Sequence, residues 1–200
     1  DDSLWHYGPP LCKTDYASMV SNPNFKQISF LDKDTAILTG SISSPEDQFI
    51  DDSYYRTTDG GKNWELLSFG HDVWINDVFV GKNGVAWMAG GDGDIFYTQD
   101  YGQSSHKLKP SFTSSLRLYS LCMYNENEGF ISASNNHLFQ TKNNWRHSQK
   151  IPTPFDQEKH DQAKNKWRRT VEKVMIWGDY LVVRQMGDIF YSSLDMIDWR

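Results

Sequence analysis

One short segment recurs four times along this sequence and constrains the fold more than any other feature. Each copy has an aromatic residue, a threonine or serine two positions later, and then turn residues. The copies are 41, 43 and 51 residues apart, measured between the hydroxyl residues Thr57, Thr98, Thr141 and Ser192. A period of about 40–50 residues is typical of arrays in which each repeat is one small structural unit.

Two short apolar runs divided by turn residues precede each copy. An example is Val78-Phe79-Val80 and Val85-Ala86-Trp87, with two glycines between them. We interpret each unit as four strands joined by turns, which at this period predicts a propeller blade. The predicted fold class is an all-β propeller of four antiparallel blades, either a small closed ring or part of a larger propeller. One domain is expected over residues 1–200, with blades at residues 25–70, 73–110, 116–150 and 171–200 and a charged insertion at 153–170.

The composition narrows the class of protein. With 38% hydrophobic and 14% aromatic residues in 200 positions, the chain has enough apolar material for one folded core. The formal net charge of −6 argues against nucleic acid as a partner, because phosphate binding needs a positive surface. No apolar run is long enough to span a membrane, and two cysteines are too few for a disulfide scaffold.

The start of the chain and its two cysteines leave alternatives open. Asp1-Asp2-Ser3 fits a mature secreted chain after signal cleavage and fits a trimmed chain equally well. Cys12 and Cys122 either form a bridge, or Cys122 is a small buried residue within its apolar run. We expect a periplasmic or secreted protein.

The recurring segment resembles the Asp-box, or BNR repeat, with the pattern Ser/Thr-x-Asp-x-Gly-x-x-Trp. The first copy matches it fully, the second lacks the Trp, the third keeps an Asn and a Trp in a shortened turn, and the fourth keeps only its ends. The matching residues are, in chain order, Thr57, Asp59, Gly61, Trp64, Thr98, Asp100, Gly102, Thr141, Asn143, Trp145, Ser192 and Trp199.

The motif also has a physical interpretation. A hydroxyl and a carboxylate two residues apart can accept the backbone N–H groups of a tight hairpin, and Gly61 supplies a positive φ. We therefore expect Asp59 and Asp100 to be structural, locking the turn between the third and fourth strands. A calcium-binding or catalytic role for these two aspartates is the alternative.

Two insertions are expected on the opposite face of the blades from these hairpins. The first, Ser41–Asp52, follows a second strand, and the other lies in the crossover between Trp145 and Val174. Thr153 and Pro154 suit the start of a short helix in that crossover. Both insertions lie in connections that reach the same face, so we predict the functional surface there.

The two insertions carry opposite charge. This pattern fits either a merely solvated surface or a partner-recognition patch centred on Trp167, Arg168 and Arg169, because Trp and Arg are favoured interface anchors. The candidate partner-binding residues are Glu46, Asp47, Asp51, Asp52, Lys164, Lys166, Trp167, Arg168 and Arg169.

The sequence favours a binding protein over an enzyme. Sialidases, the best-known Asp-box enzymes, use an arginine triad, a Tyr–Glu nucleophile pair and an Asp acid/base, and an Arg-Ile-Pro-like element. No Arg-x-Pro and no paired-histidine zinc motif occur here. The chain looks like the non-catalytic Asp-box propellers, among them photosystem II assembly and stability factors, which implies a scaffold that binds another protein. We expect no catalytic residue, cofactor or metal; a sialidase-like glycoside hydrolase or a glycan-binding propeller is the alternative.

Overall fold

The computed structural model describes residues 24–41, 53–68, 74–108, 110, 116–154, 170–185, 187–195 and 200. The chain divides into two compact units, residues 1–74 and 75–200. The interpretation of residues 1–200 as one domain stays a prediction. Within the part of the chain that the structure describes, no helix has the length and apolar character needed to cross a bilayer.

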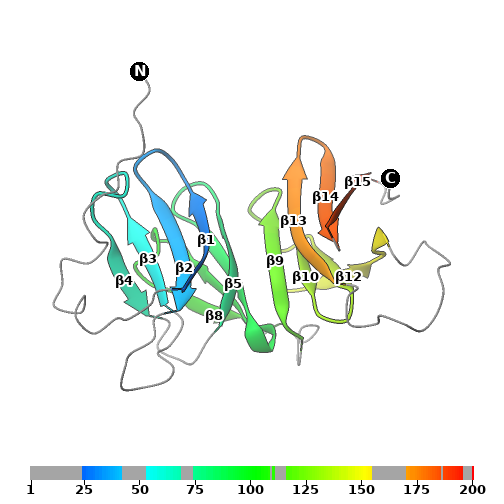
Figure 1. Ribbon diagram of the computed structural model, residues 1–200, viewed down its shortest axis with the longest axis horizontal. Helices are drawn as coiled ribbons and strands as arrows, with labels where there is room; N and C mark the ends of the chain where they lie inside the picture. Colours follow the sequence, from blue (N-terminus) through cyan, green and yellow to red (C-terminus); the bar gives the residue numbers. More distant parts are fainter. Residues whose placement is uncertain are drawn as a thin grey trace. The chain divides into compact units, whose positions relative to one another are not determined.

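The first unit contains one antiparallel sheet with its strands in chain order (Figure 1). Short turns join the first strand to the second and the third to the fourth. The strands are β1 (Asn24–Phe30), β2 (Ala36–Ser41), β3 (Ser53–Thr57) and β4 (Glu65–Ser68).

The second unit contains three more sheets, again antiparallel and in chain order. The first two have four strands each: β5 (Ile75–Val80), β6 (Ala86–Gly90), β7 (Ile95–Thr98), β8 (His106–Leu108), then β9 (Leu118–Met123), β10 (Gly129–Ala133), β11 (His137–Thr141) and β12 (Ser148–Ile151). The glycine-rich segment between β6 and β7 forms a turn that contains the short 3-10 helix η2 (Gly91–Gly93).

The last sheet has three strands among the described residues: β13 (Val171–Trp177), β14 (Tyr180–Gln185) and β15 (Asp188–Ser193). Arg200 continues it, because its N–H donates to the Tyr191 carbonyl at 3.0 Å and its carbonyl accepts the Tyr191 N–H at 3.2 Å. The predicted fold class, an all-β propeller of four antiparallel blades, is confirmed.

The four sheets share one register. Third and fourth strands pair nine residues apart, at Arg56–Glu65, Tyr97–His106, Gln140–Gln149 and again Tyr191–Arg200. The first strand of every sheet has a β-bulge near its start, which skips Lys26, Asn76, Tyr119 and Glu172 in turn. Because side chains alternate between faces along a strand, this common register places equivalent residues on the same face of every sheet.

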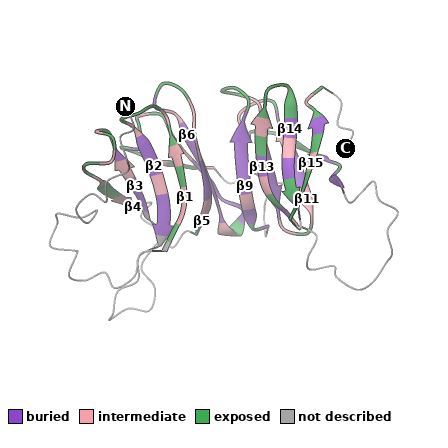
Figure 2. Cartoon of the chain, turned by 45° about the horizontal axis from the view of Figure 1, so that its top comes forward, coloured by how far each residue is buried: buried purple, intermediate pink, exposed green. Residues whose placement is uncertain are grey.

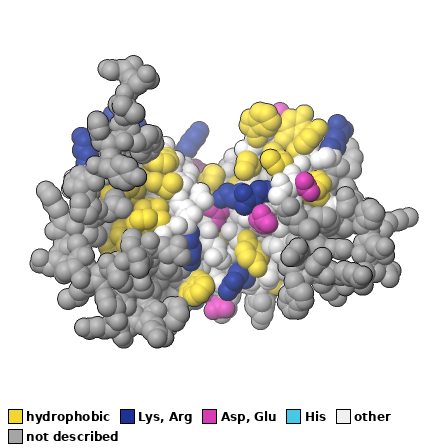
Figure 3. Space-filling model, in the orientation of Figure 1, with side chains coloured by type: hydrophobic (Ala, Val, Ile, Leu, Met, Phe, Trp, Pro, Cys, Tyr) yellow, Lys and Arg dark blue, Asp and Glu magenta, His cyan; other side chains and the backbone are white. Residues whose placement is uncertain are grey.

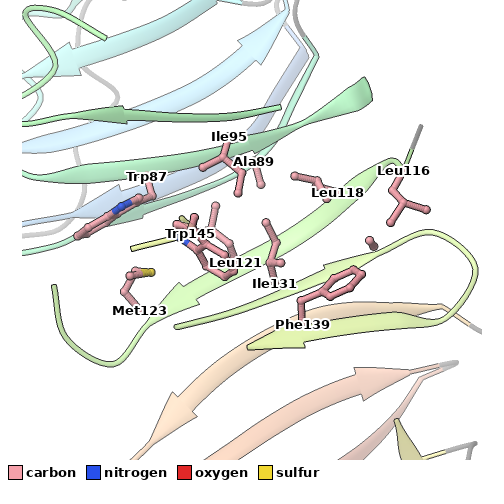
Figure 4. Packing of buried hydrophobic residues seen from close by; sticks show 11 residues of the cluster. Trp87, Ala89, Ile95, Leu116, Leu118, Leu121, Met123, Ile131, Phe139 and Trp145 are labelled. Atoms are coloured by element: carbon pink, nitrogen blue, oxygen red, sulfur yellow. The ribbon is translucent and has the colours of Figure 1, made fainter. Parts of the chain in front are cut away.

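The core of the second unit lies between successive sheets. We call the face of a sheet that packs on the next sheet its forward face, and the opposite face its rear face. Trp87 and Ile95 on the forward face of β5–β8 join one apolar cluster with Leu121, Met123 and Ile131 on the rear face of β9–β12 (Figure 4).

The next interface repeats this arrangement. Phe130 and Leu138 on the forward face of β9–β12 cluster with Val174, Leu181 and Val183 on the rear face of β13–β15. The strand β9, between β5 and β13, is therefore buried along most of its length (Figure 2).

Candidate functional site

The first recurring segment closes the β3–β4 hairpin with side-chain hydrogen bonds. Thr57 Oγ1 accepts the N–H of Gly61 at 2.9 Å and donates to Asp59 Oδ1 at 3.0 Å. The same carboxylate oxygen accepts the Asn63 N–H at 2.9 Å. The Trp64 indole folds back and donates to the Gly61 carbonyl at 3.1 Å.

The second copy repeats these bonds in the β7–β8 hairpin. Thr98 Oγ1 accepts the Gly102 N–H at 3.0 Å and donates to Asp100 at 2.7 Å. Asp100 accepts the Ser104 N–H at 2.9 Å and the Ser104 hydroxyl at 2.6 Å. Tyr101 and Gly102 both have positive φ, at 61° and 83°.

The third copy corrects one prediction, because its turn is not shortened. Thr141 Oγ1 accepts the Trp145 N–H at 2.9 Å, so Trp145 occupies the position of Gly61 and Gly102, with a φ of 64°. It is not the counterpart of Trp64. Its side chain is buried in the apolar cluster with Trp87. This burial offsets the cost of a positive φ, which residues other than glycine rarely adopt.

The fourth copy departs from this pattern. The buried Ser192 donates to the Ser193 carbonyl at 3.5 Å, and the Leu194 N–H donates to the Asp179 carbonyl at 3.0 Å. Leu194 is two residues after the hydroxyl residue. In the other three copies the corresponding N–H belongs to the residue three positions after the hydroxyl residue, as in the bond from Tyr101 to the Gly84 carbonyl at 2.9 Å. Trp199 lies outside the described residues.

The hydrogen bonds of these hairpins hold their aspartates ionised. The Asn63 N–H, followed by the Asn63 side chain, lowers the pKa of Asp59. The Ser104 hydroxyl and then the Ser104 N–H lower the pKa of Asp100 to about 2. A carboxylate whose lone pairs accept several donors is a weak base and a weak nucleophile, so this geometry suits a structural role.

The predicted partner-binding residues all lie outside the described residues: Glu46, Asp47, Asp51, Asp52, Lys164, Lys166, Trp167, Arg168 and Arg169. These residues belong to the connection between β2 and β3 and to the connection between β12 and β13. Both connections begin at the strand ends opposite the Asp-box hairpins. The helix expected in the connection after Thr153 lies outside the described residues, which end at Pro154 on this side. Whether the two connections share one face involves both units and stays a prediction.

A buried ion pair joins the first strands of all three sheets in the second unit. Asp77 on β5 accepts Lys173 Nζ from β13 at 2.8 and 2.9 Å, the Ser120 hydroxyl from β9 at 2.6 Å and the Leu121 N–H at 2.9 Å. The Asp77 side chain is 2% exposed and that of Lys173 is 30% exposed. Ser120 Oγ in turn accepts the Val174 N–H at 3.2 Å.

This network is not among the features predicted from the sequence, although a local signal for it exists. A polar residue directly precedes the first apolar run of every repeat: Gln27, Asp77, Ser120 and Lys173. The structure places each of them directly after the β-bulge of its strand. A β-bulge re-aims a side chain, and in the second unit this position brings Asp77, Ser120 and Lys173 from the three sheets together.

Cys122 carries a free thiol on β9 and is buried. Burial, with a smaller contribution from the nearby Asp77 charge, raises its pKa to about 12. Such a thiol is unreactive, which agrees with the interpretation of Cys122 as a small buried residue. Cys12 lies outside the described residues.

A cavity of about 300 Å³ lies in the second unit, at the end of the sheets where turns join the first strand to the second and the third to the fourth. We call this end of the sheets the hairpin edge. The floor of the cavity includes the buried Phe130 and Ile151, and two carboxylates, Glu128 and Asp195, line it together with Tyr124. Further lining comes from Gln140, Lys142, Gln149 and Leu194. Among the described residues, no group of three His, Cys, Asp or Glu side chains is placed to hold a metal ion.

Comparison of the sequence with known proteins gives no match, either to a family model or to a curated protein. Comparison of the fold does give matches. YCF48 bound to D1 peptide is similar, with a TM-score of 0.62 and 18% identity over 91% of this chain and 56% of that one. YCF48 from Cyanidioschyzon merolae has a TM-score of 0.61 and 7% identity over 84% of this chain and 50% of that one.

A glycoside hydrolase shares the fold as well. The GH74 xyloglucanase from Xanthomonas campestris has a TM-score of 0.53 and 10% identity over 78% of this chain and 25% of that one. The chain thus spans about half the length of the YCF48 chains it matches. Together these similarities confirm the predicted resemblance to β-propellers at the level of the fold.

Proposed function

We propose that this protein is a non-catalytic β-propeller scaffold that binds another protein in an extracytoplasmic compartment, as an assembly factor, inhibitor or immunity protein does. The observation that carries the proposal is that Asp59, Asp77 and Asp100 all take part in hydrogen bonds that hold the fold together. Each accepts several hydrogen bonds from its own hairpin or from adjoining strands, and Asp77 is also paired with Lys173. These carboxylates are thus committed to holding the sheets.

Two further points support a protein partner. The propeller of the YCF48 structure that resembles this chain holds a peptide. The connection between β12 and β13 carries Trp167, Arg168 and Arg169, residue types that commonly anchor protein interfaces. We assign the predicted partner patch to this connection and to the acidic residues between β2 and β3.

Charge reversal tests this proposal. The variant R168E/R169E and the matched control K33E/K82E each exchange two cations for two anions, but the control residues lie in exposed turns on the hairpin edge. We expect affinity capture from an extracytoplasmic extract to recover a specific protein with wild type and control. The reversed variant should recover at least about tenfold less, because charges across an interface steer and orient association.

The outcomes separate the patch from the scaffold. Equal capture by all three proteins would remove the patch but leave a binding scaffold. No saturable partner for the wild type, together with turnover of a fluorogenic glycoside, would overturn the scaffold itself. A purified partner should bind the wild type with a measurable dissociation constant by interferometry.

A glycoside hydrolase or glycan-binding propeller is the second candidate, and one observation favours it. Glu128 and Asp195 line the same cavity beside Tyr124, and glycoside hydrolysis uses a pair of carboxylates. Fluorogenic sialoside and β-glucoside substrates test this alternative. Turnover that is lost in both Glu128→Gln and Asp195→Asn would support it, whereas turnover that survives both substitutions would exclude this cavity as the active site.

A further inference from the structure

The cavity at the hairpin edge of the second unit has an apolar floor and an acidic rim. The buried Phe130 of β10 and Ile151 of β12 form part of its floor. Glu128 is half-buried in the β9–β10 turn and Asp195 follows β15, so the two carboxylates come from neighbouring sheets. Hydrophobic side chains also gather on this edge, over the end of the β13–β14 hairpin (Figure 3). An apolar floor below carboxylates suits a ligand with an aliphatic stem and a cationic end.

The charge around the cavity favours a cationic ligand. Of the described residues that line it, Glu128 and Asp195 are acidic and Lys142 is basic. Glu126 in the β9–β10 turn and Asp179 in the β13–β14 turn add two more carboxylates at this edge of the unit. Carboxylates therefore outnumber cations in and around the cavity. This excess of negative charge attracts a cation and opposes the entry of an anion.

The polar groups of the lining select among cations. Gln149 Nε2 donates to Gln140 Oε1 at 3.0 Å, so Gln149 Oε1 can act as an acceptor in addition to the carboxylates of Glu128 and Asp195. A guanidinium has five N–H donors and no acceptor, whereas an ammonium has three donors. Tyr124 lines the cavity and is 53% exposed, and guanidinium groups stack on aromatic rings. The lining therefore matches the side chain of an arginine.

The volume of the cavity fits one such side chain. About 300 Å³ is at the lower end of ligand pockets, which span about 300–1,000 Å³. We propose that the cavity binds an arginine side chain from an extended segment of the partner protein. This inference rests on the proposed function for the existence of that partner. It adds a contact at the strand ends opposite those where the β12–β13 connection begins.

A titration followed by two-dimensional amide NMR spectra tests the site without the partner. The probe is N-acetyl-arginine methylamide, and its control is N-acetyl-citrulline methylamide, which has a similar shape and no charge. We expect the arginine probe to shift the side-chain amide signals of Gln140 and Gln149, with a dissociation constant on the order of 1 mM. The citrulline probe should bind at least about tenfold more weakly, because it lacks the charge that strengthens hydrogen bonds to carboxylates.

Four substitutions locate the contact. Glu128→Gln and Asp195→Asn should each weaken binding of the arginine probe at least about fivefold, because each removes a charged acceptor. Glu126→Gln is the matched control, since it removes the same charge from the same turn but does not line the cavity; it should change the affinity less than about twofold. Lys142→Met should strengthen binding about twofold or more, because it removes a competing cation. A gain in affinity cannot arise from loss of folding.

Several results would overturn the proposal. These are equal binding of the two probes, undiminished binding in both carboxylate variants, or weaker binding in Lys142→Met. Tighter binding of methyl β-glucoside than of the arginine probe would also overturn it and would assign the cavity to a sugar. These results leave the proposed scaffold standing if the charge-reversal experiment recovers a partner. Binding of the arginine probe by a chain that captures no partner would support the cavity assignment and count against the proposed function alone.

Discussion

The sheets β9–β12 and β13–β15 have the same register and bulge, but they differ in what covers them. Both faces of β9–β12 are packed, by β5–β8 on one side and β13–β15 on the other. The β13–β15 sheet is packed on its rear face, while Ile189 and Met175 on its forward face are exposed. Burial in this repeat therefore depends on the neighbouring sheet rather than on the pattern of the strands.

Alanine substitutions at Leu138 and Ile189, which are equivalent in register, give the largest expected difference in stability. Leu138→Ala should lower the free energy of unfolding by about 2–5 kcal/mol, because it opens a cavity between two sheets. Ile189→Ala should change it by less than about 1 kcal/mol, because that side chain is exposed. Urea unfolding at low protein concentration measures both values, and equal losses would show that the two faces are covered alike.

The polar contact that fastens β13–β15 is the next test. Lys173→Met should cost about 3 kcal/mol, because it leaves the Asp77 carboxylate buried without its cation. The double variant D77N/K173M should recover much of this loss, since neither charge then remains. A double-mutant cycle from chemical unfolding measures the coupling. Additive effects of the two substitutions would mean that the ion pair contributes no coupling between β5 and β13.

Substitution of the hairpin hydroxyls tests the same two sheets, β9–β12 and β13–β15, at another equivalent position. Thr141→Val leaves the N–H groups of Trp145 and Asn143 without their acceptor and should cost about 1–3 kcal/mol. Ser192→Ala should cost less, because Leu194 stands at the position of Asn143 and offers no side-chain acceptor to the Ser192 hydroxyl. Thermal midpoints measured by circular dichroism rank the two, and the opposite order would contradict the hairpin assignment.

A smaller effect on stability depends on pH. It arises because the β7–β8 hairpin has Asp100 where the β11–β12 hairpin has Asn143. The folded-state pKa of Asp100, about 2, lies below the usual 3.8, so its ionised form stabilises the fold above pH 4. This contribution is lost as the pH falls from 4 towards 2. Asp100→Asn removes it while keeping an acceptor that the third hairpin already uses. The gap in melting temperature between wild type and D100N should therefore shrink over this range; a constant gap would exclude the hydrogen bonds as the cause.

The local features of the fold could be predicted from the sequence, and the contacts between sheets could not. Spacing and turn residues located the strands, because a hairpin such as Thr57 to Trp64 is closed by residues close in sequence. Trp145 was misassigned because its indole packs in a distant core, and that burial overrides the backbone preference. Asp77 and Lys173 are 96 residues apart in sequence, so their pairing depends on how whole sheets pack. The predicted partner residues stay untested for a different reason, since they lie outside the described residues.

Oxidation of methionines in the dilute chain tests the central claim most directly, because three of them report on three surfaces. Met175 lies on the exposed forward face of β13–β15, whereas Met88 and Met123 are buried in the β5–β8 and β9–β12 sheets. Dilute peroxide followed by peptide mass spectrometry should convert Met175 to its sulfoxide at least about tenfold faster than the other two. Equal rates at the three sites would contradict the claim that Met175 is exposed while Met88 and Met123 are buried.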